Sequence, residues 1–363
     1  MREIGVLIVD DSVIYRKFLY DIFTENLGLE KVDRVSGGQA ALDRLALGKH
    51  KLVTLDLEMP GLSGMETLSE IRRRYPDVKV LMISSHTQSG AAVTIDALEQ
   101  GAFEFVAKPN LDDREAMLRF LREEISRKVN HLLSGGPAPA VFRSTRAKVA
   151  KPIPAPKPTP MPRVHEKRAQ PSGNEIALVA IGISTGGPAA LATFLQAFPK
   201  DYSRPILIVQ HMPAMFTKAL ADSLNQKSLL NVIEAQHGLP IEAGTVYIAP
   251  GGKQMCVVKK GEVPKICITD DPPESFCKPS VDYLFRSIAG AYEGKVLALI
   301  MTGMGSDGAR GAQLLKRRGA VIWAESEESC VVFGMPREVI KLGLADEVLG
   351  LASLAKRCAA FFS

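Results

Sequence analysis

A proline-rich segment in the middle of the chain constrains the fold more than any other feature. Proline alternates with other residues from Lys151 to Pro162, a pattern that forbids helix and favours extended polyproline II. The wider segment 134–174 holds nine of the 23 prolines. We therefore predict three parts, namely a first domain over residues 1–133, a linker over 134–174 and a second domain over 175–363.

The linker also carries most of the positive charge. Eight Lys and Arg against one acid give it +7, so a chain with a net charge of +5 has −2 elsewhere. A basic segment of this kind could contact nucleic acid or an acidic partner, but a solvated spacer is the favoured interpretation. We expect no nucleic-acid partner.

Apolar runs and cysteines bear on the location of the protein. No stretch approaches the ~18 consecutive apolar residues of a membrane span, and the first residues lead into a strand-like run instead of a signal-peptide core. The five cysteines include no C-x-x-C pair, which favours reduced thiols over a disulfide framework or a zinc site. We expect a cytoplasmic protein that is not inserted in a membrane, with no cofactor in the second domain.

Short β-branched runs alternate with helical patterns in the first domain. This alternation predicts a parallel sheet with helices on both faces, in which ligands collect at the carboxyl ends of the strands. The expected strands are 4–9, 31–35, 52–55, 78–83 and 103–106.

The second domain shows the same alternation with one interruption. The expected parallel strands are 176–181, 206–209, 296–301 and 321–323. Between Gly244 and Thr269, three short β-like runs around Gly and Pro predict antiparallel strands. We therefore predict a second doubly wound, mainly parallel α/β domain with a β-hairpin insertion.

Charged and hydroxyl side chains follow the expected strands of the first domain. Asp10 and Asp11 end the first strand, Asp56 the third and Ser84 the fourth, and Lys108 follows the fifth. Carboxylates this close repel one another unless a cation neutralises them, and oxygen ligands favour Mg²⁺. Such a site can hold a phosphoryl group on Asp56, with the metal and Lys108 balancing its charge. Singly, each residue could instead be a helix cap or a loop residue.

The first ~130 residues resemble the receiver domain of two-component response regulators. The resemblance rests on Val-Asp10-Asp11-Ser, Leu-Asp56-Leu-Glu-Met-Pro-Gly, Ser84 and Ala-Lys108-Pro. It implies that Asp56 accepts phosphate from a histidine kinase, that Asp10 and Asp11 help to bind Mg²⁺, and that Lys108 contacts the phosphate.

The same resemblance implies a flavodoxin-like fold and two switch residues. Ser84 and Phe105 match the hydroxyl and aromatic switch positions of receiver domains. For Phe105, a plain core residue at the edge of the sheet explains the sequence equally well.

A glycine-rich turn opens the second domain. Gly182-Ile-Ser184-Thr-Gly186-Gly-Pro lies between a hydrophobic strand and an Ala/Leu-rich helix and matches G-x-S-x-G. A serine on such a turn can act as a nucleophile, and the free N–H groups of the helix N-terminus can stabilise an oxyanion. A phosphate-binding loop is the alternative, but the Gly-Lys-Ser/Thr ending of a P-loop is missing.

The candidate base and acid follow later strands. His211 lies just past the next expected strand, and Asp307 follows the strand 296–301. His237 is a weaker candidate, and Asp307 could also cap the helix expected over 308–317. The order Ser184, His211, Asp307 differs from the Ser-Asp-His order of α/β-hydrolases, so the turn should not be assigned to that fold.

Residues from about 176 to 354 resemble the catalytic domain of chemotaxis protein-glutamate methylesterases, which also deamidate glutamine. Matching stretches include Gly-Ile-Ser184-Thr-Gly-Gly-Pro, Gln-His211-Met-Pro, Tyr247-Ile-Ala-Pro-Gly, Pro279-Ser-Val-Asp282, Thr302-Gly-Met304-Gly-Ser-Asp307-Gly and Ser329-Cys-Val-Val-Phe-Gly-Met-Pro-Arg337-Glu.

This resemblance implies Ser184 as nucleophile, His211 as base and Asp307 as orienting acid. It also implies that Met304 contributes to the oxyanion hole through its backbone, with Thr185 beside the nucleophile. The implied substrates are glutamates of membrane chemoreceptors, so the enzyme would work at the receptor array. With a receiver attached by a spacer, we expect phosphorylation of Asp56 to control access to the active site.

Two other functions are weighed against this one. A DNA-binding regulator would suit the basic linker, but the second domain has no helix-turn-helix pattern. An inactive adaptor would not need the serine, histidine and aspartate. The sequence does not say which receptor glutamates or which kinase are involved, whether the pathway is chemotaxis, what the linker contacts, or the oligomeric state.

Overall fold

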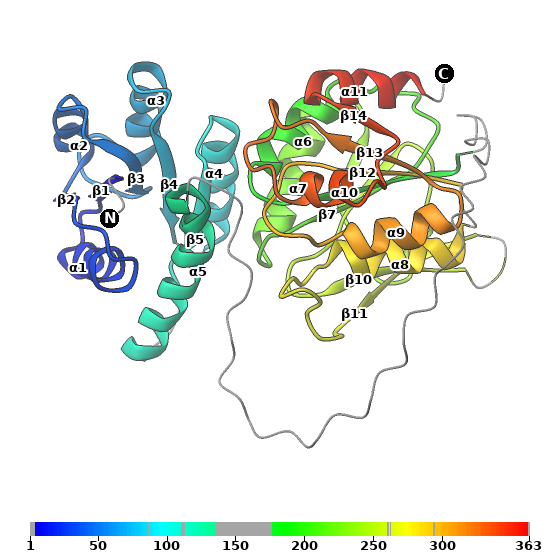
Figure 1. Cartoon of the computed structure of the whole chain (residues 1–363), viewed down its shortest axis with the longest axis horizontal. Helices are drawn as coiled ribbons and strands as arrows, with labels where there is room; N and C mark the ends of the chain where they lie inside the picture. Colours follow the sequence, from blue (N-terminus) through cyan, green and yellow to red (C-terminus); the bar gives the residue numbers. More distant parts are fainter. Residues whose placement is uncertain are drawn as a thin grey trace.

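The computed structural model contains two α/β domains that lie side by side (Figure 1). It describes residues 4–85, 87–109, 113–134, 176–259, 261, 263–292 and 295–361. Apart from residue 134, the predicted linker lies outside the described residues.

The first domain is a five-stranded parallel sheet with helices on both faces (Figure 1). The strand order β2-β1-β3-β4-β5 is that of flavodoxin-like folds, which confirms the predicted fold class. The strands are β1 (Gly5–Val9), β2 (Val32–Val35), β3 (His50–Asp56), β4 (Lys79–Ser84) and β5 (Glu104–Ala107). The helices are α1 (Val13–Asp21), which continues as the π-helical η1 (Ile22–Asn26), α2 (Gly38–Leu45), α3 (Gly64–Arg74), α4 (Gln88–Glu99) and α5 (Arg114–Ser134).

The second domain is a seven-stranded parallel sheet in the order β14-β13-β12-β6-β7-β9-β8, with a separate antiparallel hairpin of β10 and β11. Its strands are β6 (Leu178–Ile183), β7 (Ile206–Gln210), β8 (Asn231–Glu234), β9 (Thr245–Ile248), β10 (Gln254–Val258), β11 (Lys265–Thr269), β12 (Val296–Ile300), β13 (Val321–Glu325) and β14 (Glu347–Leu349). Its helices are α6 (Gly187–Leu195), α7 (Phe216–Lys227), α8 (Val281–Ala291), α9 (Ala309–Arg317), α10 (Met335–Lys341) and α11 (Leu351–Ala360).

One strand assignment from the sequence was wrong. Residues 245–248 were expected to be antiparallel with the hairpin, but β9 lies between β7 and β8 and pairs with both in parallel. All four of its residues are buried, as in an interior strand of a parallel sheet. The edge strands β8 and β14 were missed because they are short and only partly buried.

The longest helix is α5, with 21 residues, and charged side chains recur along it. Within the described ranges, no helix combines the length and the apolar character needed to cross a bilayer.

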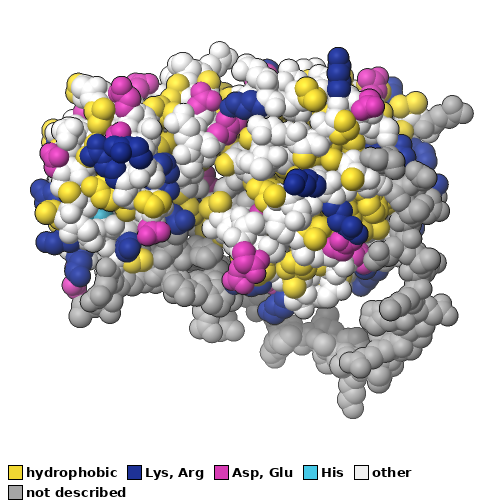
Figure 2. All heavy atoms as spheres, turned by 90° about the horizontal axis from the view of Figure 1, so that it is seen from above, with side chains coloured by type: hydrophobic (Ala, Val, Ile, Leu, Met, Phe, Trp, Pro, Cys, Tyr) yellow, Lys and Arg dark blue, Asp and Glu magenta, His cyan; other side chains and the backbone are white. Residues whose placement is uncertain are grey.

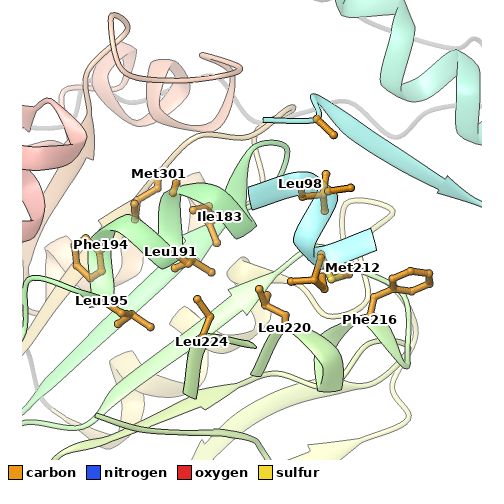
Figure 3. Close-up of a cluster of buried hydrophobic side chains, with 14 of the residues drawn as sticks. Leu98, Ile183, Leu191, Phe194, Leu195, Met212, Phe216, Leu220, Leu224 and Met301 are labelled. Atoms are coloured by element: carbon orange, nitrogen blue, oxygen red, sulfur yellow. The ribbon is translucent and has the colours of Figure 1, made fainter. Parts of the chain in front are cut away.

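The two domains meet through a shared apolar core. Figure 3 shows Leu98, from α4 of the first domain, close to Met212, Phe216 and Leu220 of the second. Phe105 of β5 packs on Phe216 with 4.4 Å between the ring centroids. Figure 2, viewed at right angles to Figure 1, shows the two lobes in contact.

Ion pairs border this core. Glu99, the last residue of α4, accepts a hydrogen bond from the Ser223 hydroxyl at 3.0 Å and pairs with Lys227 of α7. Lys227 also lies 3.8 Å from the Asp96 carboxylate. The contact between the domains therefore combines buried apolar area with charge pairing.

The core of the second domain gives a stability prediction. Leu191 of α6 is fully buried, whereas Leu229 is 66% exposed. Leu191→Ala should lower the free energy of unfolding by about 2–5 kcal/mol because it leaves a cavity. The matched control Leu229→Ala should stay within about 0.5 kcal/mol of wild type. Urea denaturation followed by the fluorescence of the single tryptophan, Trp323, measures both, and equal losses would contradict the assigned packing.

Candidate functional site

Two polar clusters lie at carboxyl edges of the parallel sheets. In the first domain, Asp56 ends β3, Asp10 follows β1 and Lys108 follows β5. The Lys108 ammonium lies 2.6 Å from Asp56 Oδ2 and 3.3 Å from Asp10 Oδ2. One ligand oxygen from each of Asp10, Asp11 and Asp56 lies within 4.8 Å of the others. The structure thus brings together the acids and the lysine singled out in the sequence.

This cluster fits a hard divalent cation. Asp10 is fully buried, and its Oδ2 atom makes the ion pair with Lys108 but accepts no hydrogen bond. Burial raises the pKa of Asp56 to about 6, the Lys108 ammonium opposes the rise, and the Asp10 carboxylate adds to it. A cation among these oxygens would favour the ionised acids, and carboxylate oxygens are the ligands that Mg²⁺ prefers.

The two expected switch residues lie on the neighbouring strands β4 and β5. Ser84 is buried, and its hydroxyl lies 2.5 Å from the Thr94 hydroxyl of α4. Phe105 is 2% exposed and packs across the domain boundary on Phe216. Ser84 of β4 therefore contacts α4, and Phe105 of β5 contacts the second domain directly.

In the second domain, Ser184 lies on a tight turn between β6 and α6. The turn requires glycine at position 186, where φ is +83°, and the segment after β12 requires glycine at position 303, where a methyl group would lie 2.7 Å from Ser184 Cβ. The Ser184 N–H donates to the Thr302 carbonyl at 2.9 Å, and the Gln210 amide donates to the Ser184 carbonyl at 3.0 Å. Hydrogen bonds thus join the backbone of Ser184, the nucleophile candidate, to residues at the ends of β12 and β7.

Asp307 is 3% exposed and accepts hydrogen bonds through both oxygens. Oδ2 lies 2.7 Å from His211 Nε2 and accepts from the Val281 N–H at 2.7 Å. Oδ1 accepts from the Asp282 N–H, the Ser280 hydroxyl and the Gly308 N–H. The carboxylate thus caps the N-terminus of α8, while Gly308 is the N-cap residue of α9.

His211 follows β7. Its backbone N–H donates a hydrogen bond to the carbonyl of Ile183, the residue before Ser184. Burial lowers the pKa of the imidazole, but hydrogen bonds with Asp307 and Cys277 outweigh it and raise the pKa above the ordinary 6.5. Burial raises the pKa of Asp307, and the contact with His211 holds it below its usual value.

The imidazole Nδ1 is the atom left to act as a base, since Nε2 faces Asp307. Among the described residues, no hydrogen bond joins the Ser184 hydroxyl to this ring. In resting enzymes such bonds are often long and shorten with substrate.

Thr185 follows the nucleophile candidate Ser184 in the chain, and Met304 follows Gly303. Gly303, which precedes Met304, packs on Ser184, and in the described part of the chain neither the Thr185 N–H nor the Met304 N–H has an acceptor. The Thr185 hydroxyl donates to the Glu104 carboxylate of the first domain at 3.0 Å. The first domain therefore contacts the residue that follows Ser184.

Several residues of the two sites were missed by the sequence reasoning. Arg16 donates to the Asp10 and Asp11 carbonyls, and the Tyr15 ring lies 4.5 Å from the Lys108 ammonium. Cys277 lies beside His211, and Ser280 bonds Asp307. The contacts of Tyr15, Cys277 and Ser280 join residues far apart in the chain, so no local pattern assigned them these contacts. His237 lies on the hairpin side, against the Ile268 backbone.

Comparisons with known proteins identify the family of each domain. Residues 179–358 match the CheB methylesterase family, and residues 6–121 match the response regulator receiver domain. A protein of Desulfotalea psychrophila named protein-glutamate methylesterase/protein-glutamine glutaminase is 41% identical, with 98% of each chain covered. A protein of the same name from Bacillus subtilis is 40% identical over 97% of this chain and 96% of its own.

The chain belongs to the protein-glutamate methylesterase/protein-glutamine glutaminase family.

Among solved structures, the CheB methylesterase catalytic domain of Thermotoga maritima matches with 39% identity and a TM-score of 0.50. That match covers 51% of this chain and 97% of the Thermotoga domain. In this chain, a receiver domain precedes the parallel α/β domain. The first-domain cluster thus lies in the receiver domain, and the second-domain cluster lies in the methylesterase domain.

The His211–Asp307 contact predicts a titration shift. Asp307→Asn should lower the His211 pKa, because burial then acts without an opposing carboxylate. Nuclear magnetic resonance titration of the His211 ring measures the shift without any need for substrate. The control Asp222→Asn, at a half-exposed position of α7, should leave the His211 pKa where it is. An unchanged pKa in Asp307→Asn would show that the contact does not tune the base.

Proposed function

We propose that this chain hydrolyses methyl esters on glutamate side chains of methyl-accepting chemoreceptors and deamidates receptor glutamines. The names of its full-length relatives support methylesterase activity on protein glutamates and deamidation of protein glutamines. The observation that carries the mechanism is the buried His211–Asp307 pair beside the Ser184 turn. The enzyme would act in the cytoplasm, at the receptor array.

The chemistry is acyl transfer through a serine ester. Ser184 Oγ attacks the γ-carbonyl of the methylated glutamate while His211 Nδ1 takes its proton. The tetrahedral intermediate collapses as the imidazolium returns that proton to the departing methanol. Water, deprotonated by the same nitrogen, then cleaves the acyl-enzyme to give the free glutamate and Ser184. With glutamine, ammonia departs instead of methanol.

Asp307 and two backbone groups support this sequence. The Asp307 carboxylate fixes the Nε2–H tautomer, so that the Nδ1 lone pair faces away from it and is available. It also stabilises the imidazolium that forms in each step. The Thr185 and Met304 N–H groups, which lack acceptors in the described part of the chain, are the proposed donors to the oxyanion.

Phosphorylation of Asp56 by a histidine kinase is the proposed control. Asp10, Asp11 and Asp56 would hold Mg²⁺, with Lys108 contacting the phosphoryl oxygens. When bound, the metal supplies positive charge that stabilises the transferring phosphoryl group. Ser84 and Phe105 would carry the change to α4 and to the domain boundary.

The contact between the domains explains why phosphorylation would matter. In the unphosphorylated state, Glu104 holds Thr185 next to the nucleophile, and Phe105 packs on Phe216. A chemoreceptor must replace this contact to reach Ser184. Changes at the switch positions would weaken the contact and shift the population toward an open arrangement.

Removing the nucleophile tests the activity. Ser184→Ala should reduce methanol release from methylated receptor membranes by roughly 10³-fold or more, because no other group can form the serine ester. The control Ser203→Ala, at an exposed position, should retain the wild-type rate. Substantial methanol release by Ser184→Ala would sink the mechanism.

Loosening the domain contact tests the control. Glu104→Ala should raise the rate of the unphosphorylated protein by about fivefold, the equivalent of one hydrogen bond of about 1 kcal/mol. The increase should shrink once a small-molecule phosphodonor has modified Asp56. The control Glu123→Ala, on the exposed side of α5, should behave as wild type. A Glu104→Ala protein that is no faster before phosphorylation would argue against a closed resting state.

A further inference from the structure

A thiol that the proposed mechanism does not use lies against the catalytic imidazole. Cys277 Sγ is 3.7 Å from His211 Nδ1, the ring nitrogen that faces away from Asp307. Cys277 is a free cysteine and is only partly buried. The Nδ1 lone pair, which is proposed to accept the Ser184 proton, therefore lies next to the Cys277 sulfur, a second atom that can bind a metal ion.

A rigid turn holds the thiol in this position. The backbones of Glu274 and Cys277 exchange two hydrogen bonds, of 3.1 and 2.8 Å, around Ser275 and Phe276. These two central residues have φ of 51° and 64°, a left-handed conformation that costs non-glycine residues about 1–3 kcal/mol each. The Arg286 guanidinium of α8 donates two hydrogen bonds to the Glu274 carboxylate, of 2.8 and 2.5 Å. Because Asp307 caps the same helix, the thiol and the imidazole share one support.

We propose that His211 Nδ1 and Cys277 Sγ form a binding site for a soft divalent metal ion, with Zn²⁺ as the reference ion, and that its occupation inhibits the enzyme. Zinc lies about 2.0–2.1 Å from a histidine nitrogen and about 2.3 Å from a cysteine sulfur. Donors 3.7 Å apart then subtend about 115° at the metal, close to the tetrahedral angle. The pair can bind one ion without moving.

The surroundings of the pair match those of zinc-binding histidines. Such histidines usually donate their other ring N–H to a carboxylate, which fixes the tautomer and increases the basicity of the ligand. Asp307 does this for His211 at 2.7 Å. Asp307 itself stays outside the coordination sphere, since its oxygens are taken by Nε2 and by the N-terminus of α8. Water would fill the remaining positions.

Inhibition follows from the use of a single lone pair. A metal ion on Nδ1 occupies the electrons that would accept the Ser184 proton. Its binding converts the Cys277 thiol to the thiolate and releases the thiol proton to solvent. Thiolate and imidazole select zinc-like ions, whereas the receiver carboxylates select Mg²⁺. The two clusters of this chain would thus respond to different metals.

Binding can be measured without reference to activity, so this test remains valid even if the proposed function fails. Full-length protein in excess MgCl₂, which saturates the receiver carboxylates, is titrated with Co²⁺ as a spectroscopic probe and with Zn²⁺ by calorimetry. Wild type should bind one ion with a thiolate-to-cobalt absorption band. Cys277→Ser should lose the band and bind Zn²⁺ at least about tenfold more weakly.

Matched variants separate this site from other ligands. Cys267→Ser removes another partly buried thiol, on β11, and should bind as wild type does. Ser184→Ala should also bind, whereas His211→Gln should not, which provides a second test should Cys277→Ser fold poorly. Equal Zn²⁺ affinity in wild type, Cys277→Ser and His211→Gln would overturn the proposal, as would the lack of a thiolate band in wild type.

A second experiment, which measures inhibition by Zn²⁺, rests on the proposed methylesterase activity. Micromolar Zn²⁺ should lower methanol release by wild type and by Cys267→Ser, and a chelator should restore it. Cys277→Ser, scored against its own metal-free rate, should be at least about tenfold less sensitive. Full sensitivity of Cys277→Ser would show that the metal acts elsewhere.

Discussion

The buried carboxylate of Asp307 is the interaction on which the second domain's site depends. A desolvated charge of this kind is stable only when its hydrogen bonds are satisfied, and here the N-terminus of α8, the Ser280 hydroxyl and the Gly308 N–H supply the donors. One position remains for the His211 ring. The helix thereby holds the acid in place, and the acid holds Nε2 of the imidazole, so that Nδ1 is the ring nitrogen left for the proposed role as base.

Direct side-chain contacts also link the two domains. Phe105 and Glu104, at the edge of the receiver sheet, contact α7 and Thr185, the residue after Ser184. Because part of the apolar core is shared, the receiver domain packs directly against the second domain. Strand β5 carries Glu104, and Lys108 follows it directly, so this strand joins the carboxylate cluster of the first domain to the Ser184 turn.

Much of this could be predicted from the sequence because parallel sheets place strand ends together. Once the strands were recognised, Asp10, Asp56 and Lys108 had to converge, and Ser184 and His211 followed neighbouring strands. The parts that could not be predicted depend on distant contacts. Nothing local in the sequence shows that Asp307 caps α8 instead of α9, that Cys277 lies on His211, or that β9 joins the main sheet.

A double-mutant cycle on Ser184 and His211 tests most directly whether these groups act as one unit. Rates of receptor demethylation are measured for Ser184→Ala, His211→Gln and the double variant. If His211 serves only to activate Ser184, the double variant should be no slower than Ser184→Ala alone. Losses that multiply, so that the double variant is slower by the product of the two single effects, would contradict a shared mechanism.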